Sequence, residues 1–146
     1  MKALDFTLLD SKNREITLSN FKGQKIILYF YPKDNTPGCT QEACAFRDSY
    51  ERLLEKNCII IGISPDSPKS HSNFETKHTL PFILLSDPDK EVAKLYDVYK
   101  LKKLYGKEYM GVERSTFIIS EEFEIIKTYQ KVKVNGHIDE ILTFLR

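Results

Sequence analysis

An apolar strand that leads directly into a cysteine-bearing helix is the feature that most constrains this chain. Residues 25–31 are almost entirely aliphatic or aromatic, which is typical of a strand covered on both faces. A polar loop with two prolines follows. Apolar residues then recur at helical spacing: Ala43, Phe46, Tyr50, Leu53 and Leu54. Cys39 therefore falls in the first turn of a helix, where unpaired backbone N–H groups and the helix dipole favour thiolate over thiol.

The elements around this stretch predict a βαβ unit at the centre of a larger sheet. The helix is expected over residues 39–56, and residues 58–64 form a second apolar run. Strand, helix and strand in succession indicate a right-handed crossover between two parallel strands. The other predicted strands are residues 6–9, 15–18, 80–85, 112–119 and 124–129. The other predicted helices are residues 67–78, a segment from Asp87 or Asp89 to Tyr96, and residues 136–145.

Together these elements predict an α/β fold with a central mixed sheet, helices on both faces and an N-terminal β-hairpin. At 146 residues and 41% apolar composition, the chain is long enough to bury a sizeable core. It contains no internal repeat, low-complexity segment or linker. We therefore expect residues 1–146 to form a single domain.

Charge and composition narrow the range of partners. The net charge of +1 gives no overall electrostatic reason for binding nucleic acid, an acidic substrate or an anionic membrane. The basic, tyrosine-rich residues 99–110 could contact nucleic acid, but at this net charge a solvated loop beside the active site is the favoured interpretation. The chain has no apolar signal-peptide core and no stretch resembling a membrane span, so the expected location is the cytosol.

Three cysteines in a cytosolic chain are too few and too unevenly spaced for a disulfide framework. They leave three interpretations: inert core thiols, metal ligands or redox chemistry. Cys58 opens an apolar strand and is expected to be a core thiol. His71, His78 and His137 form no metal-ligand spacing pattern, and no glycine-rich phosphate loop is present. We therefore expect neither a metal nor a cofactor.

The pattern Pro32-x-x-x-Thr36-x-x-Cys39 resembles the active-site signature of the peroxiredoxins, thiol peroxidases on a thioredoxin-like fold. The longer segment 30–48 (FYPKDNTPGCTQEACAFRD) is similar to the bacterioferritin-comigratory subgroup, also called peroxiredoxin Q. So are residues 80–87 (LPFILLSD) and 105–117 (YGKEYMGVERSTF), and the resemblance covers essentially the whole chain. It implies a thioredoxin-like fold of the peroxiredoxin type. It also implies reduction of hydrogen peroxide and organic hydroperoxides without haem, metal or flavin.

Peroxide cleavage needs a deprotonated sulfur, hydrogen-bond donors for both oxygens and exclusion of water. Cys39 is the expected nucleophile. The resemblance assigns the stabilising cation to Arg114, and arginine suits this role because it stays charged and presents several fixed donors. Thr36 lies about one turn before Cys39 and could hydrogen-bond the sulfur or the peroxide. From position alone, Arg114 could equally form a surface ion pair with Glu113 or Glu121.

Three further residues are expected to support Cys39. Pro32 offers apolar shielding without a competing N–H. The backbone N–H groups of Gly38 and Cys39 could stabilise the developing oxyanion. Glu42, one helical turn after Cys39, could orient Arg114 without itself contacting the reacting atoms. The alternative, in which Cys39 is an inert thiol at a helix start and Thr36 and Pro32 are ordinary loop residues, is disfavoured by the surrounding motif.

Cys44 raises a separate question, because a sulfenic acid on Cys39 must condense with a second thiol before it is overoxidised. Cys44 lies five positions after Cys39. In an intact helix, this spacing puts their two Cα atoms roughly 8 to 9 Å apart, whereas a disulfide needs less than about 7 Å. Cys44 can therefore resolve Cys39 only if the helix unwinds. Otherwise Cys44 is a small core residue and a partner thiol does the resolving. The resembled subgroup uses this spacing, which favours resolution by Cys44.

The resemblance implies that an outside dithiol protein, usually a thioredoxin and sometimes a glutaredoxin, reduces a Cys39–Cys44 disulfide. No cysteine lies near the C-terminus, so the active state need not be a dimer and a monomer is expected. Two alternatives remain. A thiol–disulfide oxidoreductase acting on protein disulfides is disfavoured because four residues separate the cysteines, in place of a CxxC. A redox-sensing or holdase binding module would require oxidation-dependent client binding with negligible peroxidase turnover.

Overall fold

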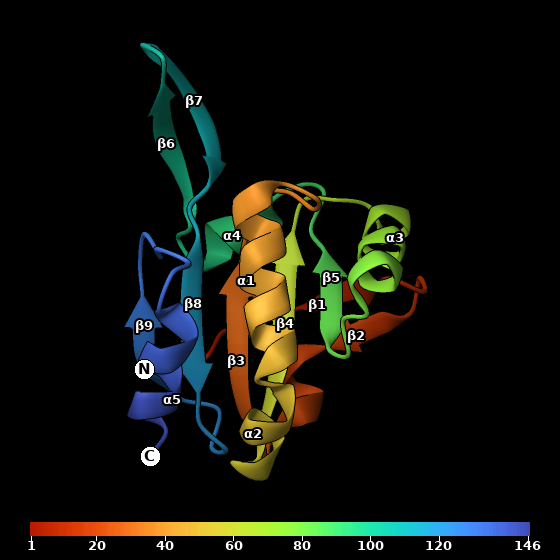
Figure 1. The fold of residues 1–146 in the computed structure, drawn as a ribbon, viewed down its shortest axis with the longest axis vertical. Coiled ribbons are helices and arrows are strands. Elements are labelled where there is room, and N and C mark those ends of the chain that lie inside the picture. Colours follow the sequence, from red (N-terminus) through yellow and green to blue (C-terminus); the bar gives the residue numbers. More distant parts are fainter.

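A seven-stranded mixed sheet forms the centre of the computed structural model, which describes residues 1–146 (Figure 1). Its strands are β1 (Thr7–Asp10), β2 (Glu15–Thr17), β3 (Lys25–Phe30), β4 (Cys58–Ser64), β5 (Ile83–Ser86), β8 (Ser115–Ile119) and β9 (Ile125–Tyr129). A separate pair consists of β6 (Tyr99–Leu104) and β7 (Lys107–Val112). The helices are α1 (Pro37–Asp48), α2 (Tyr50–Glu55), α3 (Pro68–His78), α4 (Glu91–Leu95), α5 (His137–Phe144) and the 3-10 turn η1 (Leu18–Phe21). None of the helices has both the length and the apolarity needed to cross a membrane.

The strand order in the large sheet is β2-β1-β5-β4-β3-β8-β9. β3, β4 and β5 are parallel to one another, as the predicted βαβ unit requires. β8 runs antiparallel to β3, and β1 runs antiparallel to β5. β1 and β2 form the predicted N-terminal hairpin. The expected fold class, an α/β fold with a mixed sheet, is therefore confirmed.

Alternate side chains of β3 enter two separate cores, one on each face of the sheet. The core covered by α4 and η1 contains Ile26, Leu28 and Phe30. The core covered by α1, α2, α3 and α5 contains Ile27, Tyr29 and the next residue, Tyr31. Figure 1 shows α1 across the front of β3 and β4, with α5 and α3 on either side of it. Burial on both faces explains the unbroken apolar sequence of β3.

The helix predicted over residues 39–56 is in fact two helices. α1 begins earlier, at Pro37, because the fixed φ and missing N–H of proline suit the first helical turn. Ser49 interrupts the run with a ψ of 4°, and its hydroxyl accepts a hydrogen bond from Arg52 Nη2 at 2.9 Å. Serine favours helix ends over interiors because its side chain bonds locally, so α2 starts anew at Tyr50.

Two predicted strands begin later than expected. β5 starts at Ile83 rather than at residue 80, because Pro81 has no N–H to give to a strand ladder. β8 starts at Ser115 rather than at residue 112, because Val112 ends β7 instead. The α3 boundary was predicted well, since the Ser67 hydroxyl caps the helix by accepting from the Ser70 N–H at 3.1 Å.

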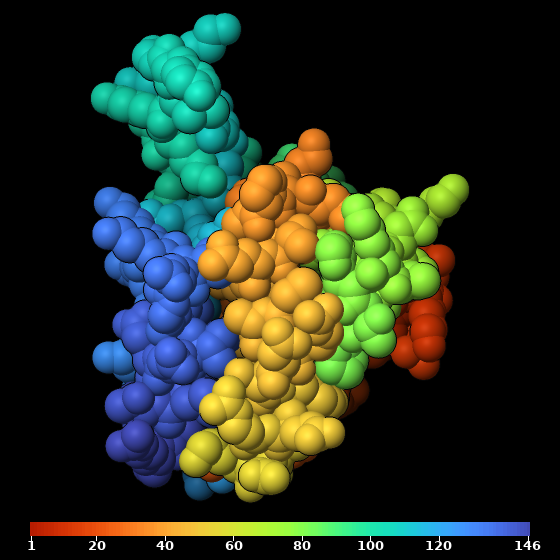
Figure 2. Space-filling model, in the orientation of Figure 1, coloured from red at the N-terminus to blue at the C-terminus, as the bar shows by residue number.

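Residues 99–110, expected to be a solvated loop, form most of a β-hairpin that projects from the body of the molecule (Figures 1 and 2). β6 and β7 pair from Tyr99 opposite Val112 to Leu104 opposite Lys107. The turn residues Tyr105 and Gly106 both have positive φ, 52° and 78°, which is the geometry of a two-residue hairpin turn. Lysines lie on both strands, so the sequence shows no clear alternation of apolar and polar residues that would have predicted them.

Candidate active site

Cys39 lies at the carboxyl end of β3, in the first turn of α1. Residues 31–36 connect the two elements, with Thr36 as the N-cap residue. The Thr40 N–H donates to the Thr36 carbonyl at 2.9 Å, so the first turn of the helix closes directly around Cys39. Only 1% of Cys39 is exposed. The thiol therefore lies at a helix start, as predicted, and is shielded from bulk water.

Arg114 brings a guanidinium to this sulfur from the neighbouring strand. It immediately precedes β8, whose first residue pairs with the last residue of β3. This register places Arg114 at the same edge of the sheet as the loop that carries Cys39. Arg114 Nη2 donates to Cys39 Sγ at 3.3 Å. The alternative of a surface ion pair with Glu113 or Glu121 is wrong, because Arg114 pairs with neither of them and Glu121 pairs with Lys25.

Glu42 contacts the same guanidinium on its other side. Arg114 Nη1 donates to Glu42 Oε1 at 2.6 Å, and the Glu42 side chain is 1% exposed. Burial raises the pKa of Glu42 to about 7, although the charge and hydrogen bond of Arg114 act in the opposite direction. Burial also disfavours the charged guanidinium, but Glu42 and Cys39 together raise the pKa of Arg114 above its ordinary value. The contact expected between Glu42 and Arg114 is therefore present.

Gly38 and Thr36 make contacts that the sequence did not predict. A Cβ at Gly38 would lie 3.1 Å from Arg114 Nη2, so glycine lets the guanidinium approach the helix start closely. The Thr36 hydroxyl donates to the Lys33 carbonyl at 2.8 Å. Of the two partners expected for Thr36, the Cys39 sulfur and the peroxide, the sulfur is not bonded, because the hydroxyl donates to the Lys33 carbonyl instead. The lone pairs of the hydroxyl can still accept a hydrogen bond from a ligand.

Pro32 lines a recess of about 390 Å³ between the loop and the base of the β6–β7 hairpin. The facing wall includes Tyr99, Lys102 and Val112. Lys102 Nζ donates to the Val112 carbonyl at 2.7 Å. Burial, and to a smaller extent the charge of Arg114, lowers the pKa of Lys102. The base of the projecting hairpin therefore forms one wall of the approach to the loop.

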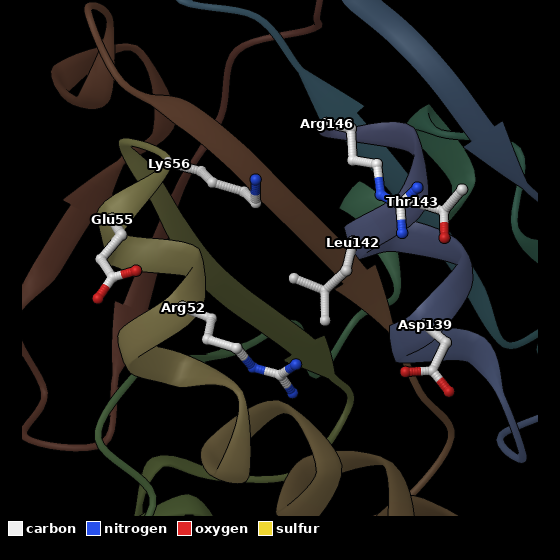
Figure 3. Close-up of a pocket in the computed structure, with 7 residues that line it drawn as sticks. All are labelled: Arg52, Glu55, Lys56, Asp139, Leu142, Thr143 and Arg146. Atoms are coloured by element: carbon white, nitrogen blue, oxygen red, sulfur yellow. The ribbon is translucent and has the colours of Figure 1, made fainter.

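A larger recess, of about 660 Å³, lies between α2 and α5 (Figure 3). Its lining is mainly charged, with Arg52, Asp139 and Arg146 around the side chain of Leu142. None of the predicted site residues lines this recess. The contacts of the Cys39 sulfur, rather than the size of a recess, therefore mark the candidate site.

The three cysteines are all free thiols in different surroundings. Cys39 is buried and Cys44 is half-buried, and both belong to the unbroken helix α1. A disulfide between them therefore requires α1 to open. Cys58 is buried at the start of β4, and its thiol donates to the Lys56 carbonyl at 3.6 Å. Burial raises the pKa of Cys58, which fits the core thiol that we expected there.

The sequence interpretation missed the buried polar residues Tyr29, Asp34 and His71. The Tyr29 hydroxyl, like Glu42 Oε2, is buried without a hydrogen-bond partner. A Cβ at Gly62 would lie 2.8 Å from the Tyr29 ring, so this glycine makes room for it. Asp34 and His71 form a buried pair at 2.7 Å. The alternation of β3 could have placed Tyr29 under α1, but no sequence signal joins Asp34 to His71.

Comparison with known protein families agrees with this geometry. The model of the AhpC/TSA family matches residues 1–128. Peroxiredoxin Bcp from Bacillus subtilis (strain 168) is 53% identical over 145 residues, covering 99% of this chain and 92% of that protein. Both matches include the loop, the start of α1 and Arg114.

Solved structures support the same relationship. Xanthomonas campestris peroxiredoxin Q matches with a TM-score of 0.91 and 41% identity, covering 96% of this chain and 89% of that one. The bacterioferritin comigratory protein of Xanthomonas campestris, solved as trapped-intermediate and ligand complexes that concern its alkyl peroxide reduction activity, matches with the same TM-score, identity and coverage. The chain therefore belongs to the AhpC/TSA family, in which it is a peroxiredoxin of the Bcp or peroxiredoxin Q type and hence a thiol-dependent peroxidase.

Proposed function

We propose that Cys39 is the peroxidatic nucleophile and that hydrogen peroxide and organic hydroperoxides are the substrates. The Cys39 thiolate attacks one peroxide oxygen, the O–O bond breaks, and hydroxide or alkoxide leaves and takes up a proton. The sulfur becomes a sulfenic acid. The observation that carries this proposal is the 3.3 Å hydrogen bond from Arg114 Nη2 to the buried Cys39 Sγ. The alkyl peroxide reduction described for the Xanthomonas campestris protein supports the wider substrate class.

Arg114 has two proposed tasks at the reacting atoms. Before attack, its positive charge and the Nη2 donor stabilise the Cys39 thiolate. During attack, the same cation stabilises the negative charge that develops on the departing oxygen. Glu42 is a positioning residue in this scheme, because it fixes Nη1 at 2.6 Å and so limits where Nη2 can lie.

Three loop groups complete the proposed site. The backbone N–H groups of Gly38 and Cys39 lie in the first turn of α1, where they have no partner within the helix and can donate to the developing oxyanion. The Thr36 hydroxyl, which already donates to the Lys33 carbonyl, accepts a hydrogen bond from the peroxide. Pro32 keeps water from the sulfur on the side of the hairpin recess.

Cys44 is the proposed resolving thiol. Its sulfur attacks the sulfenic sulfur of Cys39, releases water and forms a disulfide. The Cα atoms lie roughly 8 to 9 Å apart in a regular helix, so the first turns of α1 must unwind in each cycle. A dithiol protein of the thioredoxin type, or a glutaredoxin, then supplies two electrons and two protons to restore both thiols.

We also propose that the protein acts as a cytosolic monomer. A resolving thiol within the same chain removes the need for a thiol from a partner subunit. A cycle that consumes an outside dithiol fits a compartment in which dithiols are kept reduced. Sedimentation equilibrium of the reduced and oxidised forms measures the oligomeric state, and a stable dimer in both forms would contradict the monomer.

Intact mass after one equivalent of hydrogen peroxide tests the cycle. Wild type is expected to lose two hydrogens, and Cys44→Ser is expected to gain one oxygen at Cys39 that a sulfenic-acid probe can capture. Cys58→Ser is the matched control and is expected to behave as wild type. Capture of a sulfenic acid in wild type without the disulfide would overturn the role of Cys44. No rapid oxidation of wild type would overturn the role of Cys39.

A further inference from the structure

A second buried pair, Asp34 and His71, joins the active-site loop to α3. The Asp34 carboxylate accepts three hydrogen bonds: from the Tyr31 hydroxyl at 2.6 Å, from the Ser70 hydroxyl at 2.8 Å and from His71 Nδ1 at 2.7 Å. The side chains of Asp34 and His71 are 1% and 0% exposed. Asp34 is in the middle of the loop and only five positions before Cys39, whereas Ser70 and His71 belong to α3.

Both ring nitrogens of His71 have partners within the protein. His71 Nε2 lies 2.9 Å from the Leu85 carbonyl, which can only accept, so Nε2 carries a proton. Nδ1 faces the carboxylate of Asp34 and donates to it. The Tyr31 hydroxyl also lies 3.4 Å from Nδ1. Both ring nitrogens of His71 are thus held by groups of the protein, one in the active-site loop and one in β5.

The same cluster has the composition of a cation site, since ligand atoms of Asp34, Asp66 and His71 lie within 4.8 Å of one another. A metal-binding imidazole needs a free lone pair, and both nitrogens of His71 already face protein acceptors. Hydrogen bonding within the protein thus accounts for the arrangement of these side chains.

The backbone of the loop is tied to the same region. The Asp34 N–H donates to Asp66 Oδ2 at 2.7 Å, and this oxygen also accepts from the Ser64 hydroxyl at 2.6 Å. The Ser86 hydroxyl in turn donates to the Asp66 carbonyl. Asp34 is therefore attached by both its backbone and its side chain to β4, β5 and α3. In Figure 1, α3 and α1 lie on the same face of the sheet, and this loop leads into α1.

We propose that the Asp34–His71 pair positions the active-site loop for the peroxide step and sets the N-terminal limit of the rearrangement that accompanies unwinding of α1. The proposal rests on the proposed role of Cys39. With Asp34 fixed, the chain from Asp34 to Cys39 keeps the helix start under Arg114. When Cys39 moves toward Cys44, the loop stays anchored and only residues beyond Asp34 rearrange. Loss of this anchor is expected to slow peroxide attack and leave disulfide closure unchanged or faster.

Two isosteric substitutions of His71 test the pair. The side-chain nitrogen of asparagine falls near the position of Nδ1, and that of glutamine near Nε2. His71→Asn keeps a donor to Asp34, whereas His71→Gln keeps only the donor to the Leu85 carbonyl. Rapid-quench mass spectrometry at one equivalent of hydrogen peroxide measures Cys39 oxidation and Cys39–Cys44 closure separately. Thermal unfolding of both variants measures their stability.

The rate of Cys39 oxidation is expected to fall about tenfold in His71→Gln and no more than about threefold in His71→Asn, because small displacements of reacting groups cost large factors. Closure is expected to be no slower in either variant. Oxidation at the wild-type rate in His71→Gln would overturn the proposal. So would equal losses in the two variants that follow their melting temperatures, since these would indicate only a structural role.

Two milder variants keep the test decisive if His71→Gln does not fold. Tyr31→Phe and Ser70→Ala each remove one neutral donor to Asp34, and each is expected to slow Cys39 oxidation about threefold. Wild-type rates in both would overturn the proposal. A wild-type protein that fails to oxidise rapidly at Cys39 would instead overturn the proposed function, so the two failures are distinguishable.

Discussion

Arg114 Nη1 and Glu42 Oε1 lie 2.6 Å apart although 72 positions separate the two residues in the chain. Glu42 is on α1, one turn beyond Cys39, whereas Arg114 comes from the segment that leads into β8. The same guanidinium donates to Cys39 Sγ through Nη2. Because the guanidinium is rigid and planar, the contact at Nη1 restricts the position of Nη2. The charge on Arg114 and its orientation can therefore be tested separately.

Substitution of Arg114 tests the contribution of its positive charge to the oxidation of Cys39. Arg114→Ala is expected to slow Cys39 oxidation about 100-fold or more, because no other cation contacts the sulfur. Arg114→Lys is expected to lie between alanine and wild type, since it keeps the charge but loses the second fixed donor. Single-turnover oxidation by hydrogen peroxide measures both. Lys25→Ala, which removes a cation paired with Glu121, is the control. A wild-type rate in Arg114→Ala would contradict this role.

Orientation of Arg114 is tested at Glu42. Glu42→Gln keeps an acceptor oxygen for Nη1, whereas Glu42→Ala removes it. We expect oxidation of Cys39 to slow about tenfold in Glu42→Ala and about threefold in Glu42→Gln. Equal rates in the two variants would show that the acceptor does not orient the guanidinium. Thermal unfolding is the control, because the alanine variant also leaves a cavity.

The same carboxyl predicts how stability depends on pH. Burial raises the pKa of Glu42 from 4.5 to about 7. Between these values the folded state holds a proton that the unfolded chain has lost, so raising the pH favours unfolding. Glu42 is expected to cost about 3 kcal/mol of stability as pH rises through this window, and no more above it.

Glu42→Gln isolates this effect, because the amide cannot ionise. Denaturant unfolding at pH 5 is expected to give similar stability for wild type and the variant. At pH 8 the variant is expected to be more stable, by up to about 3 kcal/mol. Parallel stability curves from pH 4 to 9 would mean that Glu42 keeps an ordinary pKa in the folded protein.

The sequence was most informative where one local pattern determined the structure. The apolar runs of β3 and β4 were predicted because both strands are buried on both faces. The position of Cys39 in the first turn of a helix was predicted because proline and glycine mark the entry to that helix. The β6–β7 hairpin was missed because its strands are largely exposed and contain several lysines. Without a buried face, the sequence of these strands shows little alternation of apolar and polar residues. Its turn, Tyr105-Gly106, was the available signal.

In the candidate site too, residues close together in the sequence could be predicted and long-range contacts could not. Cys39, Thr36 and Glu42 lie within two turns of chain and could be grouped by spacing alone. Arg114 was placed only through the resemblance to a family, because strand pairing between β3 and β8 brings it to Cys39. His71 reaches Asp34 through the packing of α3, which no local pattern encodes. Sequence therefore pointed to the candidate nucleophile and to Glu42, but not to the contact between Asp34 and His71.

Gly38 offers a test in which activity is expected to fall without a loss of stability. Alanine is favoured over glycine within a helix by roughly 1 kcal/mol, so Gly38→Ala should not lower the melting temperature. Its Cβ would lie 3.1 Å from Arg114 Nη2, so the guanidinium must shift away from the helix start. We expect Cys39 oxidation to slow about tenfold. Gln41→Ala, an exposed position on the same helix, is the control. A wild-type rate in Gly38→Ala would show that the reaction tolerates displacement of Arg114 from its contact with Cys39.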